Sequence, residues 1–266
     1  MTAKKQRLDV FLHERGYFDS RERAKAAIMA GQVLVNGKRA EKPGISVEPD
    51  ISVEVAGGLR YVSRGGLKLE KALASFNIDL TGKVVLDVGA STGGFTDCAL
   101  QNGALRVYAV DVGYGQLAWK LRSDPRVVVI ERTNIRNLQP ESLDSRPDFI
   151  TIDVSFISLA KVLPHIARLA DGKARGIALV KPQFEAGRDK VGKKGVVRDP
   201  QTHKEVLKNI SDVVRGSGWS TLGIDFSPIR GPEGNIEYLI YFDLANNVDF
   251  SEEIITEVVE KAHQSV

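Results

Sequence analysis

Residues 83–96, KVVLDVGASTGGFT, join an apolar run to a glycine-rich turn, and this combination decides the fold class. The run is apolar on both faces, as expected of a strand in a parallel sheet that helices cover. Helical patterns separate it from similar runs at 106–112, 126–131, 148–155 and 176–182. Strands that alternate with helices predict an α/β fold with a doubly wound, mostly parallel sheet. Two closely spaced runs, 221–227 and 236–244, predict an added antiparallel strand.

The glycine-rich turn predicts a cofactor site, because ligands of such sheets bind beyond the carboxyl ends of the strands. Its spacing, G-x-x-x-G-G, differs from the dinucleotide fingerprint, and no GK[ST] follows it. An acid before the turn suits an ammonium group, and an acid that ends the next strand suits ribose hydroxyls. An ammonium group and a ribose together indicate S-adenosylmethionine as the cofactor. The alternative is that the glycines of the turn are needed only for packing. The candidate contacts are Asp87, Gly89, Ala90, Ser91, Thr92, Gly93, Gly94, Phe95 and Asp111.

Three charged residues stand at the ends of apolar strands, where burial is costly unless the charges are paired. Asp153 and Lys181 each follow a strand, and Glu237 begins the last one. Because the carboxyl ends of neighbouring parallel strands meet at one edge, we expect Asp153 and Lys181 to lie close together. A structural ion pair that ties two strands is the alternative to a functional site.

A fourth charge lies in residues 61–73, YVSRGGLKLEKAL, which read as an extended piece, a Gly-Gly break and a helix. Lys68 runs along the edge of the buried stripe that includes Leu69 and Ala72. A lysine there can cover apolar surface with its stem while its amine reaches water. Alternatively, the helix packs beside the strand ends, and Lys68 joins the other three charges.

The first sixty residues predict a small separate module. Two amphipathic helices are followed by short strands, and Asn36-Gly37 predicts a tight hairpin. Residues 1–42 hold ten Lys/Arg against five Asp/Glu. A basic excess of this kind indicates a nucleic-acid or anionic-surface partner.

Chain length, net charge and composition exclude several classes of protein. The chain has 266 residues, a net charge of +3 and 42% hydrophobic residues, enough for a large domain and a small one. Its one cysteine, Cys98, cannot form an internal disulfide, which fits a cytoplasmic protein. We expect no signal peptide, no membrane span and no metal site, because neither a long apolar run nor a Cys/His cluster is present. We also expect a monomer.

Two resemblances unite these features. Residues 7–56 resemble the S4 RNA-binding domain, and the order Lys68, Asp153, Lys181, Glu237 resembles the K-D-K-E tetrad of FtsJ-like ribose 2′-O-methyltransferases. With VGASTGGFTD, IDVSFISL, VKPQFEAG, GVVRD and GPEGNIEYL, the whole chain resembles the TlyA family, whose members were also named haemolysins. The resemblance implies a Rossmann-like methyltransferase that modifies cytidines of ribosomal RNA with S-adenosylmethionine. It divides the chain into an S4-like domain (1–60), a linker (61–66) and a catalytic domain (67–266).

The resemblance also implies roles. A ribose 2′-hydroxyl needs a base, which we assign to Lys181, with Asp153 orienting it and Lys68 and Glu237 as a second pair. The sequence alone leaves Lys68 open as the base. The stretch IDVSF lacks the prolines typical of base-N-methylating enzymes. The candidate RNA contacts are Arg7, Arg21, Lys25, Lys38, Arg39, Arg64, Arg132, Lys190, Lys193 and Lys194.

Two other function classes stay open. A membrane-active haemolysin would have only the amphipathic C-terminal stretch to support it. An RNA-binding ribosome-assembly factor without catalysis would not need the four charges or the glycine turn.

Overall fold

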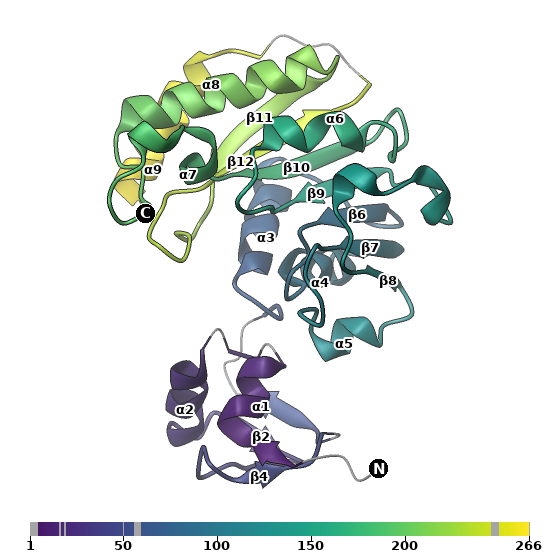
Figure 1. The fold of residues 1–266 in the computed structure, drawn as a ribbon, viewed down its shortest axis with the longest axis vertical. Helices are drawn as coiled ribbons and strands as arrows, with labels where there is room; N and C mark the ends of the chain where they lie inside the picture. Colours follow the sequence, from purple (N-terminus) through teal and green to yellow (C-terminus); the bar gives the residue numbers. More distant parts are fainter. Residues whose placement is uncertain are drawn as a thin grey trace.

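The computed structural model describes residues 5–15, 17–18, 20–49, 51–55, 60–245 and 250–265. Figure 1 shows a small N-terminal part below a large α/β part that contains the long sheet. Within the described residues, no helix is both long and apolar enough to cross a membrane.

The small part has its own apolar core, to which Leu8, Leu12 and Ile28 contribute fully buried side chains. Asn36 and Gly37 both have positive φ, at 50° and 73°, and they turn β2 into β3, which confirms the predicted hairpin. The strands form a three-stranded sheet, β3-β2-β5, and a two-stranded one, β1-β4. The elements are β1 (Gln6–Arg7), α1 (Leu8–Glu14), α2 (Arg21–Met29), β2 (Val33–Val35), β3 (Lys38–Arg39), β4 (Ser46–Val47) and β5 (Val53–Val55).

The large part is built on a seven-stranded sheet of order β11-β12-β10-β9-β6-β7-β8. All its ladders are parallel except those of β12, which runs antiparallel to both β10 and β11. The predicted mostly parallel sheet with one antiparallel strand is therefore confirmed. Its strands are β6 (Val84–Val88), β7 (Arg106–Val110), β8 (Val127–Ile130), β9 (Phe149–Ile152), β10 (Arg175–Val180), β11 (Ser220–Phe226) and β12 (Tyr238–Asp243).

Helices cover both faces of this sheet, because alternate strand residues point to opposite sides (Figure 1). Val85 and Ile177 face the layer of α3, α4 and α5, whereas Leu86 and Ala178 face α6, α8 and α9. The helices are α3 (Gly65–Ser75), α4 (Gly94–Gln101), α5 (Trp119–Arg122), α6 (Leu163–Ile166), α7 (Pro182–Glu185), α8 (Pro200–Gly216) and α9 (Glu253–Ser265). Short 3₁₀ turns at 135–137, 140–142, 159–161 and 188–190 complete the chain.

The segment that enters the large part packs closely against it. We expected Gly65-Gly66 to be a break before a helix, but α3 begins at Gly65, so this expectation is wrong. Tyr61 is buried, and a methyl group on Gly66 would lie 2.3 Å from Tyr61 Cγ. A methyl group on Gly94 would lie 2.8 Å from the Gly66 nitrogen. The glycines therefore permit close packing of α3 on Tyr61 and α4.

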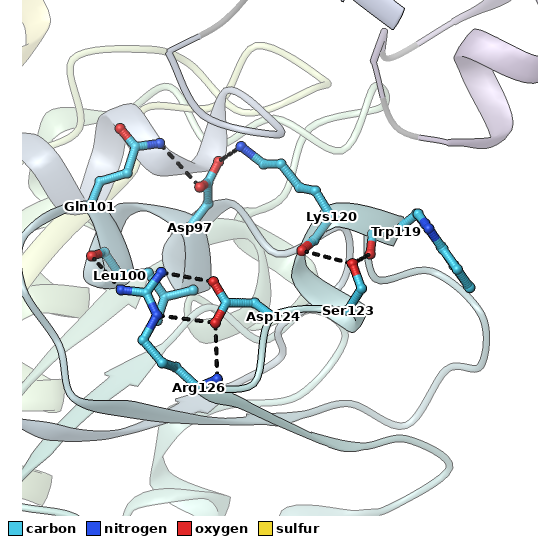
Figure 2. Close-up of polar contacts among 8 residues, drawn as sticks. All are labelled: Asp97, Leu100, Gln101, Trp119, Lys120, Ser123, Asp124 and Arg126. Atoms are coloured by element: carbon cyan, nitrogen blue, oxygen red, sulfur yellow. Dashed lines mark hydrogen bonds and ion pairs between the residues drawn. The ribbon is translucent and has the colours of Figure 1, made fainter. Parts of the chain in front are cut away.

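Asp97 on α4 anchors the same segment. Its carboxylate accepts a hydrogen bond from the Val62 backbone nitrogen at 2.8 Å. Figure 2 shows the Lys120 and Gln101 side chains converging on this carboxylate, at 2.9 and 3.1 Å. In the same view Arg126 binds Asp124 next to α5. Asp97, which the sequence analysis did not single out, thus connects the entering segment to both α4 and α5.

We predict different effects for alanine at the two neighbouring glycines. Gly66→Ala should lower the free energy of unfolding by about 1–3 kcal/mol, because the new methyl group collides with Tyr61. Gly65→Ala is the control, since a methyl group there would come no closer than 3.2 Å to another atom, the Ser63 hydroxyl oxygen. It should be neutral or stabilising by up to about 1 kcal/mol, the helix propensity gain. Equal effects in denaturant unfolding would contradict this packing.

Candidate active site

Three neighbouring strands bring the predicted charges to one edge of the sheet. Asp153 follows β9, Lys181 follows β10, and Glu237 directly precedes β12. In the antiparallel register, Val180 pairs with Tyr238, so the next position sets Lys181 opposite Glu237. Directly opposed residues in such a ladder have Cα atoms about 4.5–5.5 Å apart. The strand ends therefore place these groups side by side.

Lys181 and Asp153 form the first ion pair of this edge. Lys181 Nζ lies 2.6 Å from an Asp153 carboxylate oxygen and donates a hydrogen bond to Ser155 Oγ at 2.8 Å. The two side chains are only 11% and 20% exposed. The expected proximity of Asp153 and Lys181 is confirmed. The hydroxyl of Ser155 was missed because nothing in the sequence distinguishes it from other strand-end serines.

Lys68 and Glu237 form the second pair. Lys68 Nζ lies 2.6 Å from Glu237 Oε2, and the side chains are 10% and 1% exposed. The amine thus points inward from α3 to the start of β12 and not to solvent, so the snorkelling alternative is wrong. Gly231 makes room for this pair, because a methyl group there would lie 2.6 Å from Glu237 Oε1.

The glycine-rich turn between β6 and α4 lies against the same strand ends. Gly89 has φ +84°, and a methyl group on it would lie 2.4 Å from the Asp153 carbonyl oxygen. Gly93, with φ +97°, is in contact with Leu117 and Leu121. The glycines are therefore required by contacts within the protein.

The tip of the turn is the part that remains accessible. Ser91 is exposed and Thr92 is half-buried, whereas Ala90 and Phe95 are buried in the core beneath them. Of the predicted cofactor contacts, the structure therefore leaves the side chains of Ser91 and Thr92 at the surface. The Phe95 side chain faces the protein interior, and the backbone of Gly93 and Gly94 is buried.

The two acids near the turn are in different environments. Asp87 is fully buried, and its carboxylate accepts hydrogen bonds from Thr96 Oγ1 at 2.6 Å and Thr151 Oγ1 at 2.9 Å. Burial raises the pKa of Asp87 to about 6, against the opposing effect of these two hydroxyls. Asp87 thus supports the turn from below.

Asp111 is the accessible acid of the pair. It is half-buried and accepts hydrogen bonds from the backbone nitrogens of Ser91, at 2.8 Å, and Gly113, at 2.7 Å. Each carboxylate oxygen keeps a second lone pair for a ligand hydroxyl. Asp111 and Ser91 at the tip of the turn therefore lie on one accessible rim, where the Asp111 carboxylate is an acceptor that suits ribose hydroxyls.

The predicted RNA contacts of the small part include two arginines that share a buried acid. Arg7 holds Asp9 with two hydrogen bonds, at 3.0 and 3.1 Å, and Arg21 adds a third at 3.1 Å. The Arg7 hydrogen bond is the main cause that lowers the pKa of Asp9 to about 2. Asp9 fixes both guanidinium groups, whose side chains stay about half exposed. Its role was not predicted, because pairing across two helices has no local signal.

The remaining basic candidates are spread over both parts. Lys38 and Arg39 are exposed on β3, and Lys25 is half-buried on α2. In the large part, the Arg132 guanidinium lies 4.0 Å from the Tyr114 ring centroid. The others are Arg64, half-buried at the start of α3, Lys190, paired with Glu205, and the exposed Lys193 and Lys194.

An exposed aromatic side chain beside the strand ends was also missed. Phe156 is 91% exposed with φ +63°, three residues after Asp153, and its ring centroid lies 5.1 Å from that of Phe184. Solvent-exposed aromatic rings are the side chains on which unpaired bases stack. Nothing in the sequence IDVSF indicates that the Phe156 side chain is exposed.

We predict that breaking the buried pair destabilises the fold. Lys68→Met should lower the free energy of unfolding by about 3–5 kcal/mol, because Glu237 is left buried without a partner. Lys68→Met/Glu237→Met should cost less than the sum of the single changes. Lys71→Met, one turn along α3 at the more exposed Lys71–Asp225 pair, is the control and should cost at most about 1 kcal/mol. Equal losses for Lys68→Met and Lys71→Met in denaturant unfolding would contradict the assignment.

Comparison with known proteins supplies the family. Residues 61–244 match the FtsJ-like methyltransferase model, and residues 6–50 match the S4 domain. The TlyA 16S/23S rRNA (cytidine-2′-O)-methyltransferase of Mycobacterium tuberculosis is 44% identical over 262 residues, covering 98% of each chain. Hemolysin A of Brachyspira hyodysenteriae is also 44% identical, over 89% of this chain and 99% of its own.

A solved structure agrees with these matches. A proposed hemolysin from Streptococcus thermophilus superposes with a TM-score of 0.78 at 47% identity, covering 98% of this chain and 96% of that one. The predicted S4 domain and methyltransferase sheet are confirmed. The chain belongs to the TlyA family, in which an S4 domain precedes an FtsJ-like methyltransferase domain.

Proposed function

We propose that this methyltransferase modifies the 2′-hydroxyl of cytidine in ribosomal RNA, with S-adenosylmethionine as the methyl donor. The observation that carries the proposal is the pair of buried lysine–carboxylate contacts beside the glycine-rich turn. The activity of the Mycobacterium tuberculosis relative supports the choice of substrate. The reaction would take place in the cytoplasm, where ribosomal RNA is found.

The rim formed by the turn and by Asp111 would hold the methyl donor. Asp111 would accept hydrogen bonds from ribose hydroxyls, while Ser91 and Thr92 contact polar groups from the tip of the turn. Asp87 would act on the donor's amino group only from beneath the turn, through a bridging group such as water. When bound, S-adenosylmethionine supplies a methyl group on a positively charged sulfur, which leaves as a neutral thioether.

Lys181 would act as the general base. In its neutral form, after its ammonium has released a proton to solvent, the amine would accept the proton of the ribose 2′-hydroxyl as the oxygen forms its bond to the methyl carbon. Asp153 and Ser155 hold the Lys181 amine in place, at 2.6 and 2.8 Å. Glu237 lies opposite Lys181 across the β10–β12 border and is paired with Lys68 from α3, so this pair would fix the strand end that carries the base.

Both the small part and the large part would hold the RNA. Arg7 and Arg21, fixed by Asp9, would contact phosphates from the small part, together with Lys25, Lys38 and Arg39. Arg64, Arg132, Lys190, Lys193 and Lys194 would contact the strand near the reaction centre, and the exposed ring of Phe156 would stack on a base. We propose the division into residues 1–60 for capture, 61–66 as connection and 67–266 for catalysis.

Nucleoside analysis tests this function. Purified protein, labelled S-adenosylmethionine and ribosomal RNA that lacks the modification should give label in 2′-O-methylcytidine after complete digestion. Lys181→Met should slow transfer at least about 100-fold, the usual minimum contribution of a general base. Lys173→Met, exposed before the other end of β10, is the matched control and should react like the original protein. Label in a base, or an undiminished rate for Lys181→Met, would overturn the proposal.

A further inference from the structure

A cavity of about 380 Å³ lies outside the strand-end site, where two sequence motifs meet. One wall comes from the GVVRD segment, the other from the loop between β11 and β12, and α9 closes the end. Its lining includes Val197, Arg198, Arg230, Gly234, Ile236 and His263.

Buried hydrogen bonds hold the two walls together. Asn235, 1% exposed, accepts from the Val197 nitrogen at 3.0 Å and donates to the Gly195 carbonyl oxygen at 2.9 Å. The fully buried His203 lies behind the wall, with its Nε2 atom 3.1 Å from the Val197 carbonyl oxygen and its Nδ1 atom 2.7 Å from Tyr238 Oη. A carbonyl oxygen can only accept, so Nε2 carries the proton. Hydrogen bonds from buried side chains therefore hold both walls of the cavity in place.

The charge of the lining favours an anion. Arg198 is exposed and has no hydrogen-bond or ion-pair partner among the residues that the structure describes. Arg230 donates to the Gly234 carbonyl oxygen at 2.8 Å, which fixes its guanidinium at the rim. Glu233 is the one carboxylate among the described lining residues, and it is exposed. Two planar guanidinium groups at a polar cavity suit a phosphate, which they can bind with paired hydrogen bonds.

The cavity is also close to the reaction centre. Gly231, next to Arg230, packs against the Glu237 carboxylate and donates its backbone hydrogen bond to the Asn235 carbonyl oxygen at 2.9 Å. Neighbouring Cα atoms are 3.8 Å apart, so the Arg230 backbone lies next to the residue that packs against Glu237. Figure 1 shows the loop between β11 and β12 projecting from the large part toward the small one. An RNA strand that contacts both parts of the molecule would pass the rim of the cavity.

We propose that this cavity binds a backbone phosphate of the RNA strand that carries the target ribose. The inference rests on the proposed function for the identity of the strand. Arg198 and Arg230 are the binding residues, and Asn235 and His203 position the walls. The site would fix the nucleotides beside the target, while the S4 domain holds RNA farther away.

The test measures RNA affinity against salt concentration, with unlabelled cofactor product bound so that no transfer occurs. Arg198→Gln and Arg230→Gln should each weaken binding about threefold to tenfold, and each should reduce the salt slope by about 1. Arg215→Gln on α8, where the arginine is exposed and paired with Asp212, is the control and should change neither quantity. Thermal unfolding of all variants shows whether they remain folded.

Each outcome decides the proposal. Reduced affinity with a reduced slope and an unchanged thermal midpoint supports it. Unchanged affinity for Arg198→Gln, or reduced affinity with an unchanged slope, overturns it. A thermal shift with inorganic phosphate that Arg198→Gln abolishes, without any effect on RNA, would assign the cavity to a free anion and also overturn it. If the original protein gives no 2′-O-methylcytidine while the salt slopes change as expected, the proposed function fails and the phosphate site stands.

Discussion

The buried ion pair between Lys68 and Glu237 is the constraint on which the rest of the site depends. It joins α3 to β12 across 169 positions of sequence, with Glu237 only 1% exposed. Removing two charges from water is costly, and good geometry is needed to offset that cost. The fold supplies this geometry through close glycine contacts. Gly66 lets α3 approach Tyr61 and α4, and Gly231 leaves room for the Glu237 carboxylate.

The glycine-rich turn also depends on close contacts that only glycine permits. Gly89 packs so closely against the Asp153 carbonyl group that a methyl group there would lie 2.4 Å from its oxygen, which places the turn directly against the residue that pairs with Lys181. The alternative weighed for this turn, that glycine serves packing, holds for the glycines themselves. The tip at Ser91 and Thr92 and the carboxylate of Asp111 remain for a ligand. In the proposed function, packing and binding thus fall to different residues of the turn and its neighbouring strand end.

Much of this arrangement could be predicted from the sequence, because it follows from local patterns. Apolar runs gave the sheet, Asn36-Gly37 gave the hairpin, and charges at strand ends gave Asp153 and Lys181 as neighbours. The missed features depend on contacts between distant residues. Gly65-Gly66 has the composition of a hinge, yet it packs against Tyr61 and α4. Asp9 and Asn235 act through partners that only the folded chain brings near.

The central claim is that the two ion pairs work as one catalytic centre, and single-turnover kinetics tests it most directly. The measurement compares methyl transfer by Glu237→Gln, Lys181→Met and the double variant at saturating RNA and S-adenosylmethionine. Residues that act as a unit lose activity non-additively. The double variant should therefore be about as slow as Lys181→Met alone. Losses that multiply, or a Glu237→Gln variant that reacts at the original rate, would contradict a shared centre.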